Sequence, residues 1–281
     1  MHAEIMGNGR DLVLIHGWGM HGGIWGGVVP ELSRHFRVHV VDLPGYGASP
    51  ACQPYDLDTL AARLADSIPD GAGVIAWSLG GLVAQRLAVL NADKVERLML
   101  VGSSPCFVQR PDWPHGIEAA VLQQFADDLG RDYAGTLLRF LSLQARNGEN
   151  VRTVMKYLRV ALFSRGIPST EVLSAGLNIL LESDLRSNVA HIRQPVCLMH
   201  GDRDMLANID AARWMSGQLA GSRLTAPSPM VTPSPTLPRL RERGQSARCA
   251  SSGLIEIPGC AHAPFISHAG QFQQAVMEFF A

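Results

Sequence analysis

The sequence predicts an α/β fold with a mostly parallel central sheet, helices on both faces of the sheet and an inserted helical lid. Short apolar runs alternate with amphipathic runs of helical spacing, as in parallel sheets that helices cover on both sides. The alternation stops between roughly Cys106 and His191, where nearly every run has a helical period. With 281 residues, of which 47% are hydrophobic, the chain can bury a large core.

Six short apolar runs are expected to form the strands of the sheet. Each is followed by glycine-rich or polar residues, and amphipathic runs such as 57–68 and 82–90 supply helices between them. The predicted strands are 11–16, 38–43, 73–77, 95–102, 194–201 and 253–259.

The helical stretch divides the chain into a core and an insert. Residues 1–105 are expected to form the first part of the core, 106–190 the lid and 191–281 the second part of the core. Four helices are expected in the lid, at 116–129, 133–144, 150–163 and 170–181. The segment Thr225 to Gly253 is rich in Pro, Ser and Arg and has no apolar period, so we expect a disordered insertion in the second part of the core.

Composition argues against several classes of protein. The 24 Lys and Arg residues balance 25 Asp and Glu residues, which is not the charge of a general nucleic-acid binder. The five cysteines are scattered, which favours reduced thiols in the cytoplasm and gives no metal site. The N-terminus does not resemble a signal peptide, and no run approaches the roughly 18 apolar residues of a membrane span. We therefore expect a cytoplasmic monomer without metal, cofactor or membrane contact.

A candidate nucleophile follows the predicted strand 73–77. The stretch Ala76-Trp77-Ser78-Leu79-Gly80 departs from the usual Gly-x-Ser-x-Gly elbow at its first position. The positions two before and two after the serine must be small, because the following helix passes close to the strand. Alanine adds one methyl group and permits the turn if its φ is negative. Taken alone the motif is weak, since similar strings occur in many strand-to-helix turns.

Two later segments supply the partners that such a serine needs, namely a histidine base and a carboxylate that orients it. The run "MHGDRDML" offers Asp202 and Asp204, of which Asp204 is favoured by the Gly-x-x-Asp spacing, and Asp202 is expected to support the turn. The loop "GCAHAPF" offers His262, whereas His268 lies at the mouth of a predicted helix. The order Ser78, Asp204, His262 is that of an α/β-hydrolase triad.

An oxyanion hole requires two backbone N–H groups that point at the same oxygen. Leu79, directly after the serine, is one candidate donor. The other is Trp18, in the glycine-rich stretch "LIHGWG" after the first predicted strand. This stretch has neither the spacing of a P-loop nor that of a dinucleotide-binding loop, so nucleotide binding is set aside.

The sequence resembles the family of pimeloyl-acyl-carrier-protein methyl ester esterases of biotin synthesis (the BioH family), within the α/β-hydrolase superfamily. The resemblance covers nearly the whole chain outside 225–253, and "SSPCF", "RFLSLQ" and "AHAPFISH" are its most particular segments. It implies that Ser78, Asp204 and His262 are catalytic and that Trp18 and Leu79 bind the oxyanion and the substrate. It also implies an acyl pocket at 140–144, comprising Phe140, Leu141, Ser142, Leu143 and Gln144. The family usually has glycine at the position of Ala76.

A basic face is expected on the third lid helix. Arg152, Lys156 and Arg159 lie three and four positions apart, away from the apolar face of that helix. From the sequence alone a solvated surface is the more common explanation of such a face. The resemblance implies instead that Arg139, Arg152 and Lys156 bind an acidic acyl carrier protein.

The implied reaction is hydrolysis of the methyl ester at the far end of a pimeloyl chain on acyl carrier protein, with methanol as the leaving product. Reasoning from the residues alone stops at small-molecule esters or related acyl bonds. A general short-chain carboxylesterase, or a lyase or haloperoxidase on the same fold, is therefore an alternative. A catalytically impaired relative that acts as a binding protein is a third possibility.

Overall fold

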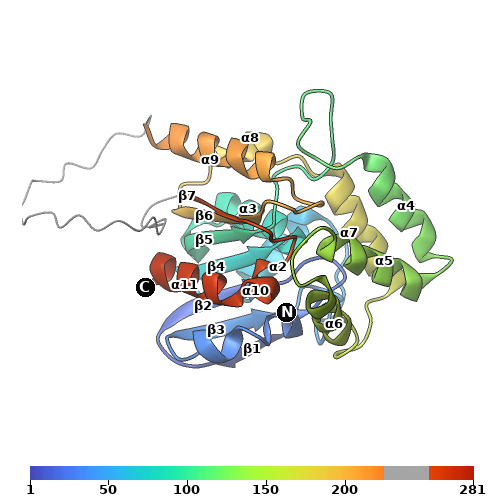
Figure 1. Ribbon diagram of the computed structural model, residues 1–281. Coiled ribbons are helices and arrows are strands. Elements are labelled where there is room, and N and C mark those ends of the chain that lie inside the picture. Colours follow the sequence, from blue (N-terminus) through green and yellow to red (C-terminus); the bar gives the residue numbers. More distant parts are fainter. Residues whose placement is uncertain (225–252) are drawn as a thin grey trace, which may run out of the picture.

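A seven-stranded sheet forms the centre of the computed structural model, which describes residues 1–224 and 253–281 (Figure 1). The spatial order is β1-β3-β2-β4-β5-β6-β7, with β1 antiparallel to β3 and all other neighbours parallel. The mostly parallel sheet predicted from the sequence is confirmed. The strands are β1 (Ala3–Met6), β2 (Arg10–Ile15), β3 (Phe36–Val41), β4 (Ala72–Trp77), β5 (Val95–Val101), β6 (Val196–Gly201) and β7 (Gly253–Ile257).

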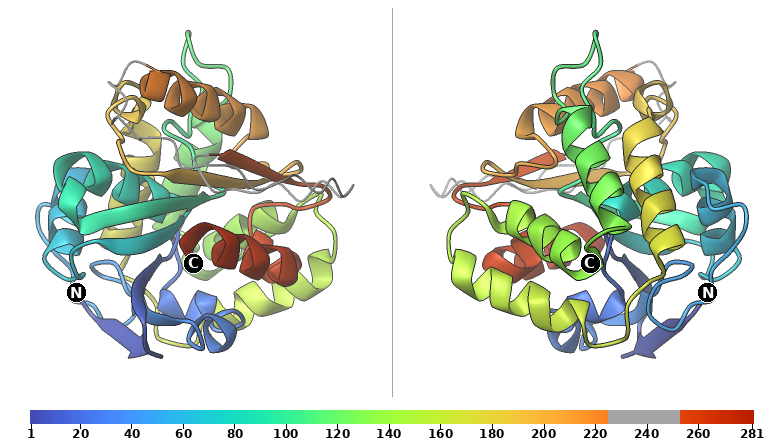
Figure 2. Two further views of the ribbon diagram at one scale, coloured as in Figure 1. Left: turned by 90° about the vertical axis from the view of Figure 1, so that its left-hand side faces the viewer. Right: turned by 90° about the vertical axis from the view of Figure 1, so that its right-hand side faces the viewer.

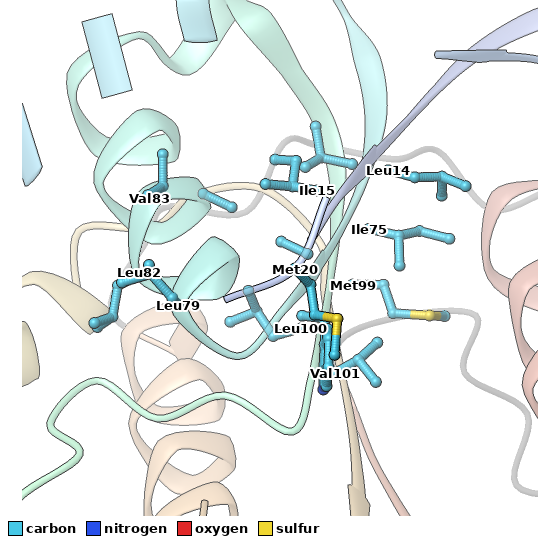
Figure 3. Close-up of a cluster of buried hydrophobic side chains, with 14 of the residues drawn as sticks. Leu14, Ile15, Met20, Ile75, Leu79, Leu82, Val83, Met99, Leu100 and Val101 are labelled. Atoms are coloured by element: carbon cyan, nitrogen blue, oxygen red, sulfur yellow. The ribbon is translucent and has the colours of Figure 1, made fainter. Parts of the chain in front are cut away.

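The central strands are buried on both faces, which explains their continuous apolar sequences. All six residues of β4 and all six of β6 are buried. Figure 3 shows one cluster of this core, in which Ile15 and Leu100 of the central strands lie on the same side of the sheet as Leu82 and Val83 of a covering helix, whereas Ile75 points to the opposite face. Dense packing of this kind fixes the ends of the strands, where the candidate site lies.

Helices cover both faces of the sheet. In Figure 1, α3, α8 and α9 lie on one face and α10 and α11 on the other, while α2 packs against α3. Their bounds are α1 (Val29–Leu32), α2 (Leu57–Ala65), α3 (Leu79–Leu90), α8 (Arg186–Val189), α9 (Ile209–Leu224), α10 (Pro264–Ser267) and α11 (Ala269–Phe280). Two short 3₁₀ turns, η1 (Gly22–Trp25) and η2 (Ala92–Lys94), complete the core.

Four further helices lie between β5 and β6 in the sequence and group together beside one end of the sheet (Figures 1 and 2). They are α4 (Ala119–Leu129), α5 (Tyr133–Ala145), α6 (Val151–Leu162) and α7 (Thr170–Glu182). Each lies within about three residues of a predicted run. Asp132 and Ser169 cap α5 and α7 by accepting hydrogen bonds from the first-turn N–H groups of Gly135 and Val172.

Two details differ from the prediction. The edge strand β1 was not expected, because four residues with only Ile5 and Met6 as large apolar side chains give too short a pattern to recognise. Gly253, which was predicted both as the end of the insertion and as the first residue of the strand 253–259, begins β7 and pairs with Cys197, so it belongs to the strand. The rest of the predicted insertion lies outside the described residues. None of the helices in the described part of the chain is both long and apolar enough to cross a membrane.

Candidate active site

Ser78 occupies a strained turn between β4 and α3. Its backbone has φ 55° and ψ −121°, a conformation that non-glycine residues rarely adopt. The turn brings neighbouring backbones very close. A Cβ added at Gly80 would collide with the carbonyl oxygen of His16, and one added at Gly17 would lie 2.9 Å from the Cβ of Ser78. The small residues around the serine are therefore required by the approach of α3 to the end of β2.

Ala76 replaces the usual glycine without distorting the strand. It is fully buried in β4 and pairs with Ile15 of β2 and Leu100 of β5. Among the described residues other than glycine, positive φ values occur only at Ser78, Asn147 and Asn150, so Ala76 keeps an ordinary strand backbone. The negative φ that an alanine needs at this position is therefore present.

His262 lies against Ser78, although 184 positions separate them in sequence. Its Nε2 is 2.9 Å from the Ser78 Oγ, and its side chain is fully buried. The loop that follows β7 delivers the imidazole to this point. His268, the rival candidate, instead lies directly before α11 and hydrogen-bonds through Nδ1 to the Ser267 hydroxyl at 2.8 Å.

Asp204 contacts the other ring nitrogen of His262. Its Oδ2 lies 2.8 Å from Nδ1, and its Oδ1 accepts hydrogen bonds from the N–H groups of Leu206 and Ala207 at 2.8 and 3.0 Å. Both side chains of the Asp204–His262 pair are fully buried, so these hydrogen bonds are little weakened by water. The chain Asp204, His262, Ser78 is the arrangement in which a histidine can take a proton from a serine hydroxyl.

The two residues predicted to supply oxyanion N–H groups, Leu79 and Trp18, both lie near Ser78 in the sequence or the fold. Leu79 is the first residue of α3, so its N–H has no partner within the helix and lies at the positive end of the helix dipole. Trp18 follows Gly17, whose backbone touches Ser78. The Trp18 side chain is buried, donates from its indole to the carbonyl of Leu173 at 2.8 Å and packs edge-on against Phe140.

The run 140–144 does not present all five residues to the interior, because it is helical. Phe140, Leu141 and Gln144 are buried, Leu143 is half-buried and Ser142 is exposed. The Ser142 hydroxyl donates to the carbonyl of Leu138 within α5. The amide oxygen of Gln144 is buried and has no hydrogen-bond partner among the described residues. A pocket formed by this run would therefore use Phe140, Leu141 and Gln144.

The four basic residues that were predicted to bind an acidic carrier protein differ in their surroundings. Arg152, Lys156 and Arg159 lie on the exposed face of α6, and no ion pair in the described part of the chain includes them. Arg139 is already engaged, since its guanidinium contacts Asp128 at 3.0 Å and Asp132 at 3.2 Å. Of these four residues, the three on α6 thus carry the positive charge that no carboxylate neutralises.

Two residues near the site were not identified from the sequence. His16 donates from Nδ1 to the carbonyl of Gly17 at 2.8 Å and accepts the N–H of Leu43 on Nε2 at 2.9 Å, which fixes the neutral tautomer. Burial lowers the pKa of His16 to about 4. Trp77 donates from its indole to the carbonyl of His262 at 2.8 Å. The sequence position of Trp77, next to Ser78, was visible, but a bond to a residue 185 positions away was not.

Within residues 1–224 and 253–281, no group of three or more His, Cys, Asp or Glu side chains is arranged to hold a metal ion. The side chains that converge on Ser78 are a histidine and, through it, a carboxylate. Such a set suits nucleophilic attack by the serine on an acyl carbon.

Comparison with known proteins places this geometry in context. The model of the alpha/beta hydrolase family matches residues 12–275. The chain is 43% identical to the pimeloyl-[acyl-carrier protein] methyl ester esterase of Nitrosomonas europaea, over 97% of this chain and 96% of that protein. It is 35% identical to the enzyme of the same name from Nitrosospira multiformis, over 99% and 97%. Among solved structures, an esterase from Exiguobacterium antarcticum superimposes with a TM-score of 0.80 over 98% of this chain and 93% of that one, and at 21% identity it supports the fold alone.

Proposed function

The chain belongs to the α/β hydrolase family and, within it, to the pimeloyl-[acyl-carrier protein] methyl ester esterases, and we propose from this that it hydrolyses the methyl ester of pimeloyl-acyl-carrier protein in biotin synthesis. The products are pimeloyl-acyl-carrier protein and methanol. One observation supports the chemistry most directly: the Ser78 hydroxyl, held on a strained turn, lies 2.9 Å from His262, whose other nitrogen lies 2.8 Å from Asp204.

In this mechanism Ser78 Oγ attacks the ester carbonyl while its proton passes to His262 Nε2. Asp204 holds the opposite N–H of the ring and stabilises the imidazolium that forms. The N–H groups of Leu79 and Trp18 receive the negative charge of the tetrahedral intermediate. Methanol leaves with the proton from His262. A water molecule that gives its proton to the same nitrogen then releases the free carboxylate from Ser78.

The carrier protein is proposed to dock on the helical segment. The exposed and unpaired charges of Arg152, Lys156 and Arg159 complement an acidic partner. A hollow of about 550 Å³ lies nearby, lined by residues of α4, α5 and the start of α6, with apolar walls from Phe125, Leu143 and Val151. Arg139 also lines the hollow, although its charge is shared with two carboxylates. Charge on α6 would steer the partner, and the apolar hollow would suit an acyl chain or its linker.

The proposal is tested by the Ser78→Ala variant, with the exposed residue Ser187 changed to alanine as the matched control. Loss of the nucleophile is expected to lower kcat about 10⁶-fold on the methyl ester of pimeloyl-acyl-carrier protein and to abolish labelling by a fluorophosphonate probe. Ser187→Ala should behave as wild type in both assays. Retention of more than a few per cent of the activity by Ser78→Ala would refute the serine mechanism.

Substrate class is tested separately by comparing that carrier-protein ester with p-nitrophenyl acetate. A much higher kcat/KM on the carrier substrate is expected for the proposed function. Equal or better turnover of the small ester would instead indicate a general short-chain carboxylesterase. A wild-type protein that the probe does not label would indicate a binding protein of hydrolase fold.

A further inference from the structure

The backbone of His262 is held from two sides by buried groups. Its carbonyl oxygen accepts the indole N–H of Trp77 at 2.8 Å, and its own N–H donates to the carbonyl of Gln144 at 3.1 Å. Gln144 lies in the last turn of α5, where carbonyl groups have no partner within the helix. All three residues are buried. Both main-chain polar groups of His262 are therefore bonded to fixed elements, and the loop residue is confined to one position.

Trp77 is linked to both reacting side chains. It is the last residue of β4 and directly precedes Ser78, whose N–H donates to the carbonyl of Val101 on the neighbouring strand. The Trp77 ring also packs against the imidazole of His262, with centroids 5.4 Å apart, and against Phe265 at 5.1 Å. Trp77 thus joins the nucleophile and the base, because its main chain forms a peptide bond with Ser78 and its indole forms a hydrogen bond with His262.

The same indole lies close to Gly17, in the loop 16–19 that contains Trp18. A Cβ added at Gly17 would lie 3.1 Å from Cε3 of Trp77, close to the limit for a tolerated contact. The end of β4, the loop that contains Trp18 and the loop that contains His262 therefore meet at the Trp77 side chain, which is fully buried. A displacement of the indole would change the 2.9 Å separation of Ser78 Oγ and His262 Nε2, on which proton transfer depends.

From this arrangement we infer that Trp77 is a positioning residue for His262, and that its indole N–H sets where the base lies relative to the nucleophile. The inference rests on the proposed function, because it assigns a role within that site. It differs from a merely structural role in a measurable way. A residue that only fills the core would change stability when truncated, whereas a positioning residue also changes the reactivity of Ser78 in the folded protein.

Two replacements of Trp77 separate these roles. Trp77→Phe removes the N–H and part of the ring, while site-specific replacement of Trp77 by 3-benzothienylalanine keeps the shape and exchanges only the N–H for sulfur. The rate constant for fluorophosphonate labelling of Ser78 and the steady-state constants for p-nitrophenyl acetate are measured on folded protein. Both variants are expected to lower the labelling rate and kcat about 10- to 100-fold, with KM nearly unchanged, because a small misplacement of a reacting group has effects of this size.

Trp113→Phe is the matched control. Trp113 is also buried, and its indole donates to the carbonyl of Cys106 at 2.9 Å, so the variant loses an equivalent hydrogen bond. The Trp113 ring packs on His115 and Trp214 instead of on the site. Its labelling rate and kcat are expected to match wild type, even where its melting temperature falls.

Three results would count against the inference. Wild-type labelling of the benzothienylalanine variant would show that the N–H has no positioning role, even if Trp77→Phe does not fold. Equal slowing of the Trp77 and Trp113 variants would indicate a general loss of stability. Failure of the probe to label Ser78 in the wild-type protein would overturn the proposed function itself, which distinguishes that failure from failure of the inference alone.

Discussion

The carboxylate of Asp202 accepts a hydrogen bond from the backbone N–H of Gly259 at 2.7 Å. This bond ties the loop after β6 to the loop that carries His262. Asp204, two positions further along, contacts the imidazole of His262 directly at 2.8 Å. The two carboxylates of one short segment therefore have different tasks, since one braces the two loops and the other orients the base.

We predict that Asp204→Asn lowers kcat by about 10⁴-fold, because an amide favours the wrong tautomer of the histidine and does not stabilise its charged form. Asp202→Asn is expected to cost less than about tenfold, since the amide oxygen still accepts the N–H of Gly259. Steady-state kinetics on a p-nitrophenyl ester measure both effects, and circular dichroism checks the fold. The opposite ranking would assign the catalytic carboxylate to Asp202.

The sequence was sufficient for six of the seven strands and for the positions of Ser78, Asp204 and His262 at the ends of strands, because both depend on local patterns. Buried parallel strands have continuous apolar runs, and the turns that follow them contain the polar residues. The edge strand β1 lacks this pattern, because it is short and only partly buried. Its position became clear only from its pairing with β3.

The surroundings of the site could not be predicted, because they depend on contacts between distant segments. Trp77 contacts His262 across 185 positions, and Arg139 lies near two carboxylates that neutralise it. Neither contact follows from spacing. The orientation of Ser142 is different, since a helical period places residues 140, 141 and 144 on one face and residue 142 on another. That part of the assignment could have been corrected from the sequence alone.

We predict that the double variant Arg152→Glu and Lys156→Glu lowers kcat/KM on the carrier-protein ester at least tenfold and leaves p-nitrophenyl acetate turnover unchanged. Both side chains are exposed on α6, outside the buried site, so their charge acts on docking. The wild-type rate on the carrier substrate should fall as salt increases, because screening shortens the range of the attraction.

The matched control for this charge reversal is Arg193→Glu. Arg193 is exposed and precedes β6, at the opposite end of the parallel strands from the loops that carry Asp204 and His262. The substitution changes the net charge by half as much as the double variant does. Because Arg193 lies away from the proposed docking face, turnover of both substrates should stay at the wild-type level. Equal losses on both substrates for the α6 variant would return its basic face to an ordinary solvated surface.

Stability is predicted to fall as the pH decreases from about 6.5 to about 4. Burial lowers the pKa of His16 and of His200 from 6.5 to about 4. In the unfolded chain both rings take up a proton below pH 6.5, so unfolding binds protons in this window and acid favours the unfolded state. Between pH 6.5 and pH 4 each ring lowers the free energy of unfolding by roughly 3 kcal/mol. Above pH 6.5 neither ring makes this free energy depend on pH. Denaturant titrations at several pH values measure this slope.

His200→Leu should reduce that pH dependence by about half. The ring nitrogens of His200 make no well-formed hydrogen bond in the described part of the chain, and their polar contact is with the backbone of Ala207, so an apolar side chain of similar size loses little. The free energy of unfolding at pH 7 is expected to be unchanged or higher. His191→Gln, at an exposed histidine, should keep the wild-type slope. An unchanged slope in His200→Leu would mean that His200 does not contribute to the acid sensitivity.

The last prediction concerns Ala76, which stands where the Gly-x-Ser-x-Gly elbow has its first glycine. Ala76 is fully buried in β4 and has an ordinary strand backbone, so restoring glycine relieves no strain at the turn. Ala76→Gly is expected to lower the free energy of unfolding by about 1 kcal/mol, through a more flexible unfolded chain and a lost buried methyl group, and to leave kcat unchanged. Ala72→Gly, equally buried at the other end of the strand, should cost a similar amount with the same kcat. If Ala76→Gly raised kcat several-fold while Ala72→Gly did not, the alanine methyl group would be distorting the nucleophile turn, and the geometry of Ser78 would be a compromise.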